Sequence, residues 1–328
     1  MAVKTVPVSV IIPTLNRPQA LVRTVKVLFG MDTVPEELVV VDQTADETVR
    51  EEMRTFLKTV TAATVRYVYQ ERPSITAARN RGIQEASRDI LLFMDDDVDV
   101  NPDTIENVYR YMQDEQVVMV GATDETLPAS TGKVGYLFGL KSWKNRKIGH
   151  VTPSMLGRYP DDIKGTVPTM WAMGFCFSLK KSKLQQWGLA FDEKLTGYAY
   201  AEDLDLTYAY YKKAVAEGLR CLLAEDVKVK HLESKEFRIP SAKNTFKYVI
   251  NREYLSYKHG MGFWARVCAR WSNFGQFLLR IMQGSGAGDV VRAQIRCDRV
   301  RKQLRQGILE DTNFWQQYRY IFVILKTK

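Results

Sequence analysis

The chain has 328 residues with a formal net charge of +9, 45% hydrophobic residues and 26% charged residues. This length is typical of about two structural units of roughly 150 residues each, and the composition excludes a disordered or collagen-like protein. The four cysteines are widely spaced without a C-x-x-C pair, which argues against a disulfide framework or a structural zinc site and fits a reducing compartment. No stretch approaches the roughly 18 apolar residues of a membrane-spanning helix.

The N-terminal part of the chain alternates apolar, β-branched runs with amphipathic segments. The apolar runs predict buried strands, and the segments with apolar residues at helical spacing predict helices. The expected order is strand 6–13, helix 19–30, strand 37–41, helix 46–59, strand 65–69, helix 74–87 and strand 89–94. This alternation predicts an α/β fold with βαβ units around a mostly parallel sheet flanked by helices.

Three of the predicted strands end in polar or acidic residues. The first is followed by the segment 13–17 (P-T-L-N-R), the second by Asp42 and the fourth by the segment 95–97 (D-D-D). Ligands of open α/β sheets bind beyond the carboxyl ends of the strands, so a site is expected there. Asp42 alone could cap the following turn, whereas three adjacent carboxylates repel one another unless a cation holds them. Oxygen ligands of this kind favour Mg²⁺ or Mn²⁺ over zinc.

Five short motifs occur along the chain in a recognisable order. They are V-S-V-I-I-P-T-L-N-R at 8–17, V-V-V-D-Q-T at 39–44, A-R-N-R-G-I at 78–83, F-M-D-D-D-V at 93–98 and A-E-D-L-D-L at 201–206. With these motifs, residues 6–232 resemble the inverting glycosyltransferases of family 2, which have the GT-A fold. The resemblance implies a Rossmann-like catalytic domain over 1–232. Its nucleotide-sugar half would cover about 1–122 and its acceptor half about 123–232.

The resemblance also implies roles for the residues at the strand ends. Asp42 would hydrogen-bond the donor base, and Arg79 would approach the base and the diphosphate unless it only belongs to a helix face. Asp97 would ligate Mn²⁺ or Mg²⁺ directly, Asp95 would meet the ribose or the water shell of the metal, and His231 would lie near the metal or be purely structural. The donor-binding residues implied in this way are Pro13, Thr14, Asn16, Arg17, Asp42, Arg79, Asp95 and Asp96.

The acceptor side follows from the same resemblance. Asp203 matches the general base that takes the proton of the acceptor hydroxyl in a single displacement, and Glu202 would orient the loop or bind the acceptor. Alternatively, both carboxylates mark an acidic helix N-terminus, which the helix dipole stabilises. Trp171 and Gly174 precede an apolar strand at 175–179. Gly174 would allow close approach to the donor sugar and acceptor, while Trp171 could stack on a sugar ring or belong to the core.

The function implied by these motifs is a metal-dependent, inverting transfer of a sugar from a nucleotide diphosphate sugar to a hydroxyl of a glycan or lipid-linked acceptor. Such a reaction would serve polysaccharide or glycoconjugate synthesis, with a UDP-sugar as the expected donor and dTDP- and GDP-sugars as alternatives. The first rival function is a nucleotidyltransferase, whose usual glycine-rich loop is absent from 13–17. The second rival is a non-enzymatic, basic membrane- or nucleic-acid-binding protein, which leaves the segment 95–97 and Asp203 unexplained.

The positive charge is concentrated in residues 233–328, which carry 18 Lys and Arg against 7 Asp and Glu. This basic extension is expected to be helical, with amphipathic helices at 263–282 and 289–309. Aromatic residues beside arginines favour an interfacial helix on an anionic membrane, whereas packing on the catalytic domain or in a homo-oligomer is the alternative. Nucleic acid is not an expected partner. Because residues 1–13 lack the pattern of a signal peptide, we expect a cytoplasmic protein that can be peripheral on the inner face of the membrane.

Overall fold

The computed structural model describes residues 3–125, 133–140, 147–160, 163–196, 199–232 and 241–309. Its helices are α1 (Pro18–Phe29), α2 (Glu47–Leu57), α3 (Ile75–Glu85), α4 (Thr104–Met112), α5 (Lys133–Leu137), α6 (Lys181–Trp187), α7 (Glu202–Ala216), α8 (Ser241–Lys258), α9 (Gly262–Met282) and α10 (Ala287–Arg305). Its strands are β1 (Lys4–Thr14), β2 (Thr33–Asp42), β3 (Thr64–Tyr69), β4 (Ile90–Met94), β5 (Val98–Val100), β6 (Val117–Asp124), β7 (His150–Val151), β8 (Gly157–Arg158), β9 (Thr166–Pro168), β10 (Cys176–Lys180) and β11 (Arg220–His231).

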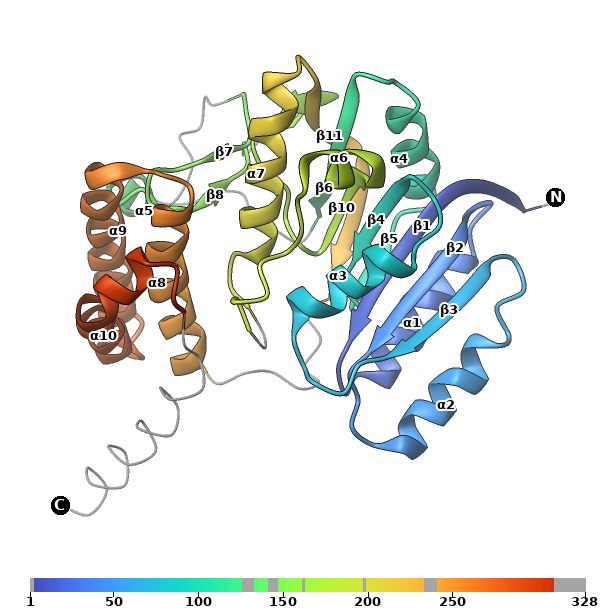
Figure 1. Cartoon of the computed structure of the whole chain (residues 1–328), viewed down its shortest axis with the longest axis horizontal. Helices are drawn as coiled ribbons and strands as arrows, with labels where there is room; N and C mark the ends of the chain where they lie inside the picture. The colour runs from blue at the N-terminus through green and yellow to red at the C-terminus, as the bar shows by residue number, and fades with distance from the viewer. Residues whose placement is uncertain are drawn as a thin grey trace.

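The main sheet of the described residues has the strand order β3-β2-β1-β4-β10-β6-β11-β5, and β9 pairs with β11. Strands β3, β2, β1 and β4 are parallel, and β10 runs antiparallel between β4 and β6. Strands β6 and β11 therefore run in the direction of β1, whereas β5 and β9 run in the opposite direction. Figure 1 shows helices on both faces of this sheet, so the predicted mostly parallel α/β fold is confirmed.

The order of the strands creates a switch point between β1 and β4. From β1 the chain adds β2 and then β3 on one side, and it returns to place β4 on the other side of β1. A crevice opens at the carboxyl ends of the strands where such a reversal occurs, and ligands bind there in open α/β sheets. The segments 15–17 and 95–97 follow β1 and β4, so the topology brings both to one place.

Strands β1, β2 and β4 are buried on both faces along most of their length, which explains their continuous hydrophobic runs. In β1, Val10 and Ile12 face the core under α1, α2 and α4, whereas Ile11 faces the core under α3, α6 and α7. Helix α3 approaches β1 so closely that a Cβ on Gly82 would lie 2.3 Å from Cγ2 of Ile11. The glycine of the A-R-N-R-G motif thus permits the contact that brings Arg79 to the end of the sheet.

The bounds of the predicted elements agree with the structure to within a few residues in the first part of the chain. Asp46 is the N-cap of α2, because its carboxylate accepts hydrogen bonds from the backbone N–H groups of Thr48 and Val49. Strand β2 is longer than predicted because Thr33 already pairs with Lys4 of β1. Strand β11 is also longer than its apolar run, since it pairs along its length with β6, β9 and β5.

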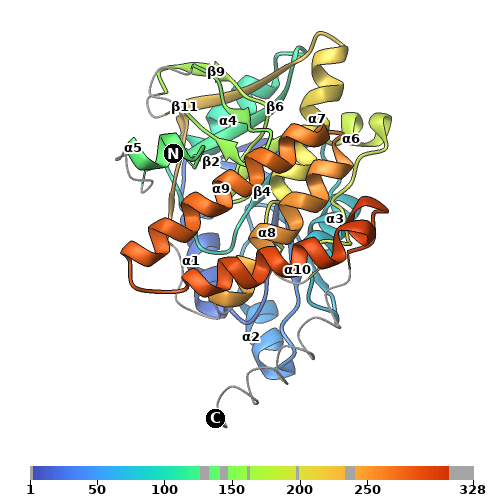
Figure 2. The ribbon, with the colours of Figure 1, turned by 90° about the vertical axis from the view of Figure 1, so that its left-hand side faces the viewer.

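The C-terminal helices α8, α9 and α10 pack together beside the sheet. Figure 2 shows α9 and α10 on the outer side of this bundle, with α8 behind them. Side chains of α8 and α10 share one hydrophobic core with Leu204 of α7, Trp171 and Leu195. The predicted helices at 263–282 and 289–309 are confirmed as α9 and α10, while residues 233–240 and 310–328 of the basic extension lie outside the described residues.

Among the described helices, none combines the length and apolar composition needed to cross a membrane.

Candidate active site

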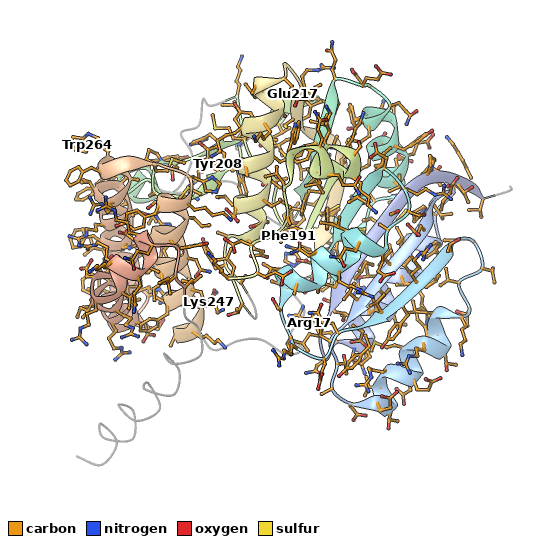
Figure 3. All side chains as sticks on the ribbon, viewed as in Figure 1. Arg17, Phe191, Tyr208, Glu217, Lys247 and Trp264 are labelled. Atoms are coloured by element: carbon orange, nitrogen blue, oxygen red, sulfur yellow. The ribbon has the colours of Figure 1, made fainter. Side chains whose placement is uncertain are left out.

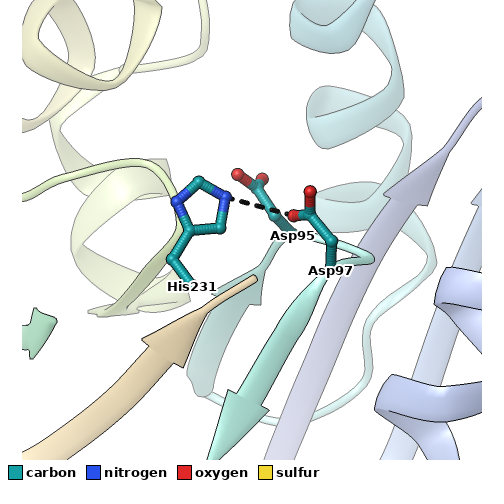
Figure 4. Close-up of side chains that lie close together, drawn as sticks. All are labelled: Asp95, Asp97 and His231. Atoms are coloured by element: carbon teal, nitrogen blue, oxygen red, sulfur yellow. Dashed lines mark hydrogen bonds and ion pairs between the residues drawn. The ribbon is translucent and has the colours of Figure 1, made fainter. Parts of the chain in front are cut away.

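Asp95, Asp97 and His231 bring their side chains together at the carboxyl edge of the sheet. The turn between β4 and β5 carries the two aspartates, and pairing of β5 with β11 places His231 opposite Val98. One ligand atom from each of the three side chains lies within 4.8 Å of the others. Figure 4 shows the imidazole facing both carboxylates, with His231 Nε2 at 3.2 Å from Oδ1 of Asp97.

The chemistry of these three groups suits a divalent cation. Two carboxylates and one imidazole form a donor set that Mn²⁺ accepts, and Mg²⁺ is compatible with the carboxylates. Burial raises the pKa of Asp95, and although Arg79 opposes this effect, the neighbouring charge of Asp97 adds to it. The hydrogen bond to Asp97 raises the pKa of His231. A cation bound here would relieve the repulsion between the carboxylates, so the residues present fit the predicted metal.

Asp96 faces away from this cluster, toward the end of β1. Its carboxylate accepts hydrogen bonds from Thr14 Oγ1 at 2.7 Å and from Arg17 Nη1 at 3.1 Å. Burial raises the pKa of Asp96 to about 7. Arg17 Nη1 also lies 3.3 Å from Oδ2 of Asp97. The implied role of Asp96 in donor binding is thus not direct in this geometry, because its side chain joins the segment after β1 to the acidic turn.

Arg79 lies beneath the site rather than on its surface. Its side chain is only 2% exposed, and its guanidinium donates to Asp95 Oδ1 at 2.9 Å, to the Gly174 carbonyl at 2.9 Å and to Glu202 Oε1 at 3.0 Å. The expected contact with the base and diphosphate is not available to a buried guanidinium with these partners. Its position instead couples the metal-binding turn to the loop of the predicted general base.

Asp203 and Glu202 begin α7, after Ala201 in a left-handed backbone conformation. The Asp203 carboxylate accepts hydrogen bonds from the Gly174 N–H at 2.6 Å and from the Leu204 N–H at 2.7 Å. Burial raises the pKa of Asp203 above its ordinary value, and burial followed by the charge of Asp203 raises the pKa of Glu202 to about 8. The pair therefore holds protons at a higher pH than free carboxylates do, which suits a general base.

Gly174 occupies a position where a side chain has little room. A Cβ there would lie 3.2 Å from Arg79 Nη2, from Asp203 Cβ and from Asp203 Oδ2. The close approach predicted for Gly174 is thus made to Arg79 and Asp203. Trp171 is only 7% exposed and packs on the ring of Tyr159, so the structure favours its assignment to the core over stacking on a sugar.

The segments after β1 and β2 contact each other at the edge of the site. Asp42 is fully buried, and its carboxylate accepts hydrogen bonds from the Thr44 N–H at 2.8 Å and from the Tyr67 hydroxyl. The Asn16 N–H donates to Thr44 Oγ1 at 3.0 Å, and Pro13 pairs with β2 inside the sheet. Asp42 therefore caps the following turn, which was its alternative role, and contact with a base would need a change in these hydrogen bonds.

A buried polar cluster that the motifs do not reveal lies behind the predicted base. His259 Nε2 lies 2.8 Å from Asp205 Oδ1, and Lys258 Nζ lies 2.7 Å from Asp205 Oδ2 and 2.8 Å from Asp192 Oδ2. Asp205 and His259 are almost completely buried. The A-E-D-L-D-L motif contains Asp205, but its partners are more than fifty residues away, at the end of α8 and directly after it, and no helix was predicted there.

The chain is similar to known proteins in sequence and in fold. Residues 9–187 match the sequence family described as Glycosyl transferase family 2. Because the match covers more than half of the chain, the chain belongs to this family. Validoxylamine A glucosyltransferase of Streptomyces hygroscopicus subsp. limoneus is 36% identical over 104 residues, which are 30% of this chain and 22% of that enzyme.

Two solved structures share the fold at low sequence identity. GalNAc-T7, solved with UDP, GalNAc and Mn²⁺, is 17% identical with a TM-score of 0.55, over 82% of this chain and 55% of that one. The mannosyltransferase PcManGT from Pyrobaculum calidifontis, solved with GDP-Man and Mn²⁺, is 15% identical with a TM-score of 0.53, over 92% of this chain and 82% of that one. This chain thus matches about half of the length of GalNAc-T7 and about a fifth of the Streptomyces enzyme.

Proposed function

We propose that the chain is a metal-dependent, inverting glycosyltransferase that moves a sugar from a nucleoside diphosphate to a hydroxyl of a glycan or lipid-linked acceptor. The observation that carries this proposal is the cluster of Asp95, Asp97 and His231, together with the nearby Asp203, which accepts a hydrogen bond from Gly174. Arg79 and Gly174 connect the two groups, because Arg79 donates hydrogen bonds to Asp95 and to the Gly174 carbonyl, and the Gly174 N–H donates to Asp203. The Mn²⁺ bound by two relatives of the same fold supports a metal at this place.

Different residues of the chain have different roles in the proposed reaction. Asp95, Asp97 and His231 would hold the cation, which supplies Lewis-acid stabilisation to the diphosphate leaving group. Asp203 accepts the proton of the acceptor hydroxyl while the hydroxyl oxygen bonds to the anomeric carbon. The bond from that carbon to the diphosphate oxygen breaks, and the electron pair leaves with the nucleoside diphosphate. The hydrogen bonds from the Gly174 and Leu204 N–H groups hold the carboxylate in place for this proton transfer.

The nucleotide of the donor can be identified by calorimetric titration of UDP, dTDP and GDP, each with and without Mn²⁺. We expect one nucleotide to bind only when Mn²⁺ is present, with UDP as the first candidate. The Asp97→Asn variant should weaken this binding about tenfold or more, because one charged ligand of the metal is lost. The metal dependence and the loss in the variant together would support the donor site.

A matched control for this experiment is Asp99→Asn. Asp99 lies two residues further along, and its carboxylate pairs with Arg23 instead of pointing into the cluster. Its substitution should leave nucleotide affinity unchanged. Failure of folded protein to bind any of the three nucleotides with Mn²⁺ would refute the proposed donor site, as would equal affinities in the wild-type and Asp97→Asn chains.

A further inference from the structure

Helix α9 exposes large apolar side chains along a single face. We call this surface the aromatic face, and it consists of Phe263, Trp264, Val267, Trp271, Phe274 and Ile281. Phe263 is 63% exposed and Trp264 is 72% exposed. At about 100° per residue, all six side chains fall within about 100° of the helix circumference, and they extend over about 27 Å of its length. Exposed apolar side chains that gather in this way mark an interaction site on the surface of a protein.

Buried contacts fix the orientation of α9 about its axis. Its inward side carries small or polar residues, among them Ala265 and Ala269. Asn273 accepts a hydrogen bond from Arg252 of α8 at 3.0 Å and donates to Gln294 of α10 at 2.9 Å. A rotation that buried the aromatic face would break these buried hydrogen bonds. The packing of the bundle therefore turns these large side chains away from α8 and α10. Trp271 and Phe274 are half-exposed and also contact the ring of Phe138, at 4.8 and 5.9 Å between ring centres.

Positive charge exceeds negative charge on α9 and α10. Residues 262–305 contain nine Lys and Arg but only two Asp and Glu. The guanidinium of Arg266 lies 5.2 Å from the ring centre of Phe263, at one edge of the face. Arg299 and Lys302 are exposed on α10, which Figure 2 shows beside α9 on the same outer side of the molecule. The surface thus combines aromatic side chains with an excess of cations.

We propose that the aromatic face of α9, together with the basic residues of α10, binds the surface of an anionic lipid bilayer. A helix with exposed Trp and Phe and flanking arginines lies in the membrane interface, where its apolar side is buried and its cations meet lipid phosphates. A second copy of the chain is a poorer partner for this surface. In a two-fold dimer the same patch would face itself, which brings like charges together.

The proposed orientation leaves the donor site accessible to water. Figure 3 shows Trp264 at one end of the molecule, whereas Arg17, which contacts Asp97, lies near the middle. A bilayer in contact with α9 would therefore not cover the carboxyl ends of β1 and β4. Membrane binding and nucleotide binding are accordingly separable properties of the chain.

The proposal can be tested by co-sedimentation of the full chain with lipid vesicles. One set of vesicles contains phosphatidylcholine alone, and the other contains one third phosphatidylglycerol. We expect binding to the anionic vesicles that weakens as the salt concentration rises, because salt screens the charges. The double variant Phe263→Glu/Trp264→Glu changes the two most exposed aromatic residues of the face. It should reduce the partition coefficient about tenfold or more, since it places carboxylates where apolar rings entered the interface.

The matched control is Val215→Glu, which changes an exposed apolar residue of α7 outside the aromatic face. This variant should bind the vesicles as the wild type does, and circular dichroism of all variants verifies that they are folded. The proposal is overturned if the wild type does not bind anionic vesicles, or if the double variant binds them equally well. It is also overturned if light scattering finds a dimer that the double variant dissociates while vesicle binding is absent.

Discussion

Asp95, Asp96 and Asp97 are consecutive in the chain, but each carboxylate has different neighbours. Asp95 pairs with Arg79, Asp96 bonds Thr14 and Arg17, and Asp97 faces His231. Successive side chains of an extended turn project in different directions, so adjacent aspartates can serve separate purposes. Two of the three carboxylates are available to a cation, while the middle one stabilises the contact between the β1 end and the acidic turn.

The raised pKa of Asp203 predicts how the reaction rate depends on pH. Burial raises the pKa of this carboxyl, and a general base acts only when it is deprotonated. The value of kcat/KM should therefore fall as the pH is lowered through the raised pKa and reach a plateau above it. A pH profile of sugar-nucleotide turnover measures this acid limb, which should lie above the ordinary aspartate range near about 4.

The Asp203→Asn variant provides the control for this profile. Its rate should fall by about 10²–10⁴-fold, because the proton acceptor is lost, and the acid limb should disappear from the residual rate. Nucleotide affinity should stay at the wild-type value, since Asp203 contacts the Gly174 and Leu204 N–H groups rather than the metal cluster. A variant that keeps both the rate and the acid limb would show that Asp203 is not the base.

The motifs were sufficient to select Asp97 and Asp203 as candidates, because each stands in a short acidic stretch at a strand end or helix start. They were not sufficient to predict what Arg79 does. Its partner Glu202 is 123 residues away in the sequence, so only the packing of α3 against the sheet could place the two together. The same packing explains why the guanidinium is buried and bonded to carboxylates.

A contact between α7 and α8 stabilises the first turn of α7, which carries Asp203. Asp205 follows Asp203 by two positions, and it is held from α8 by Lys258 and from the residue after α8 by His259. Burial lowers the pKa of Lys258, but the Asp205 and Asp192 carboxylates outweigh burial and raise it. Lys258 is therefore charged at neutral pH and compensates a buried carboxylate. The C-terminal helices thus stabilise the first turn of α7 directly.

The variant Lys258→Met tests this contact. It removes the cation but keeps an unbranched apolar chain, so it leaves the buried Asp205 carboxylate with less compensation. We expect the free energy of unfolding to fall by about 1–3 kcal/mol, measured by urea denaturation at neutral pH. The matched control is Lys4→Met. It removes an exposed ion pair with Glu106, which should contribute much less to stability because water screens it. Equal losses in the two variants would contradict the proposed stabilisation.

At the scale of the whole molecule, the C-terminal helices share a hydrophobic core with the catalytic part. Leu204 and Trp171 from the catalytic part pack with Phe246 of α8 and Leu304 of α10 in one cluster. The division at residue 232, which is a prediction from the extent of the family resemblance, does not follow a gap in this packing. A chain that lacked α8 and α10 would expose these side chains to water.

Truncation after residue 232 should therefore destabilise the protein. We expect the truncated chain to unfold at a lower temperature than the full chain, or to lose a cooperative transition, because the buried apolar surface around Leu204 is exposed. Differential scanning calorimetry of both chains in the same buffer measures the difference. An unchanged cooperative transition in the truncated chain would show that residues 1–232 fold independently.

The amino-acid sequence by itself determined the βαβ alternation, the polar strand ends and the family resemblance. Hydrophobic periodicity and short motifs are local properties, so they can be recognised before the chain is folded. Only the tertiary structure decided that His231 meets Asp97 across 134 residues and that α9 turns its aromatic face outward. These outcomes depend on strand register and helix packing, which arise from contacts between distant segments. No local pattern contains that information.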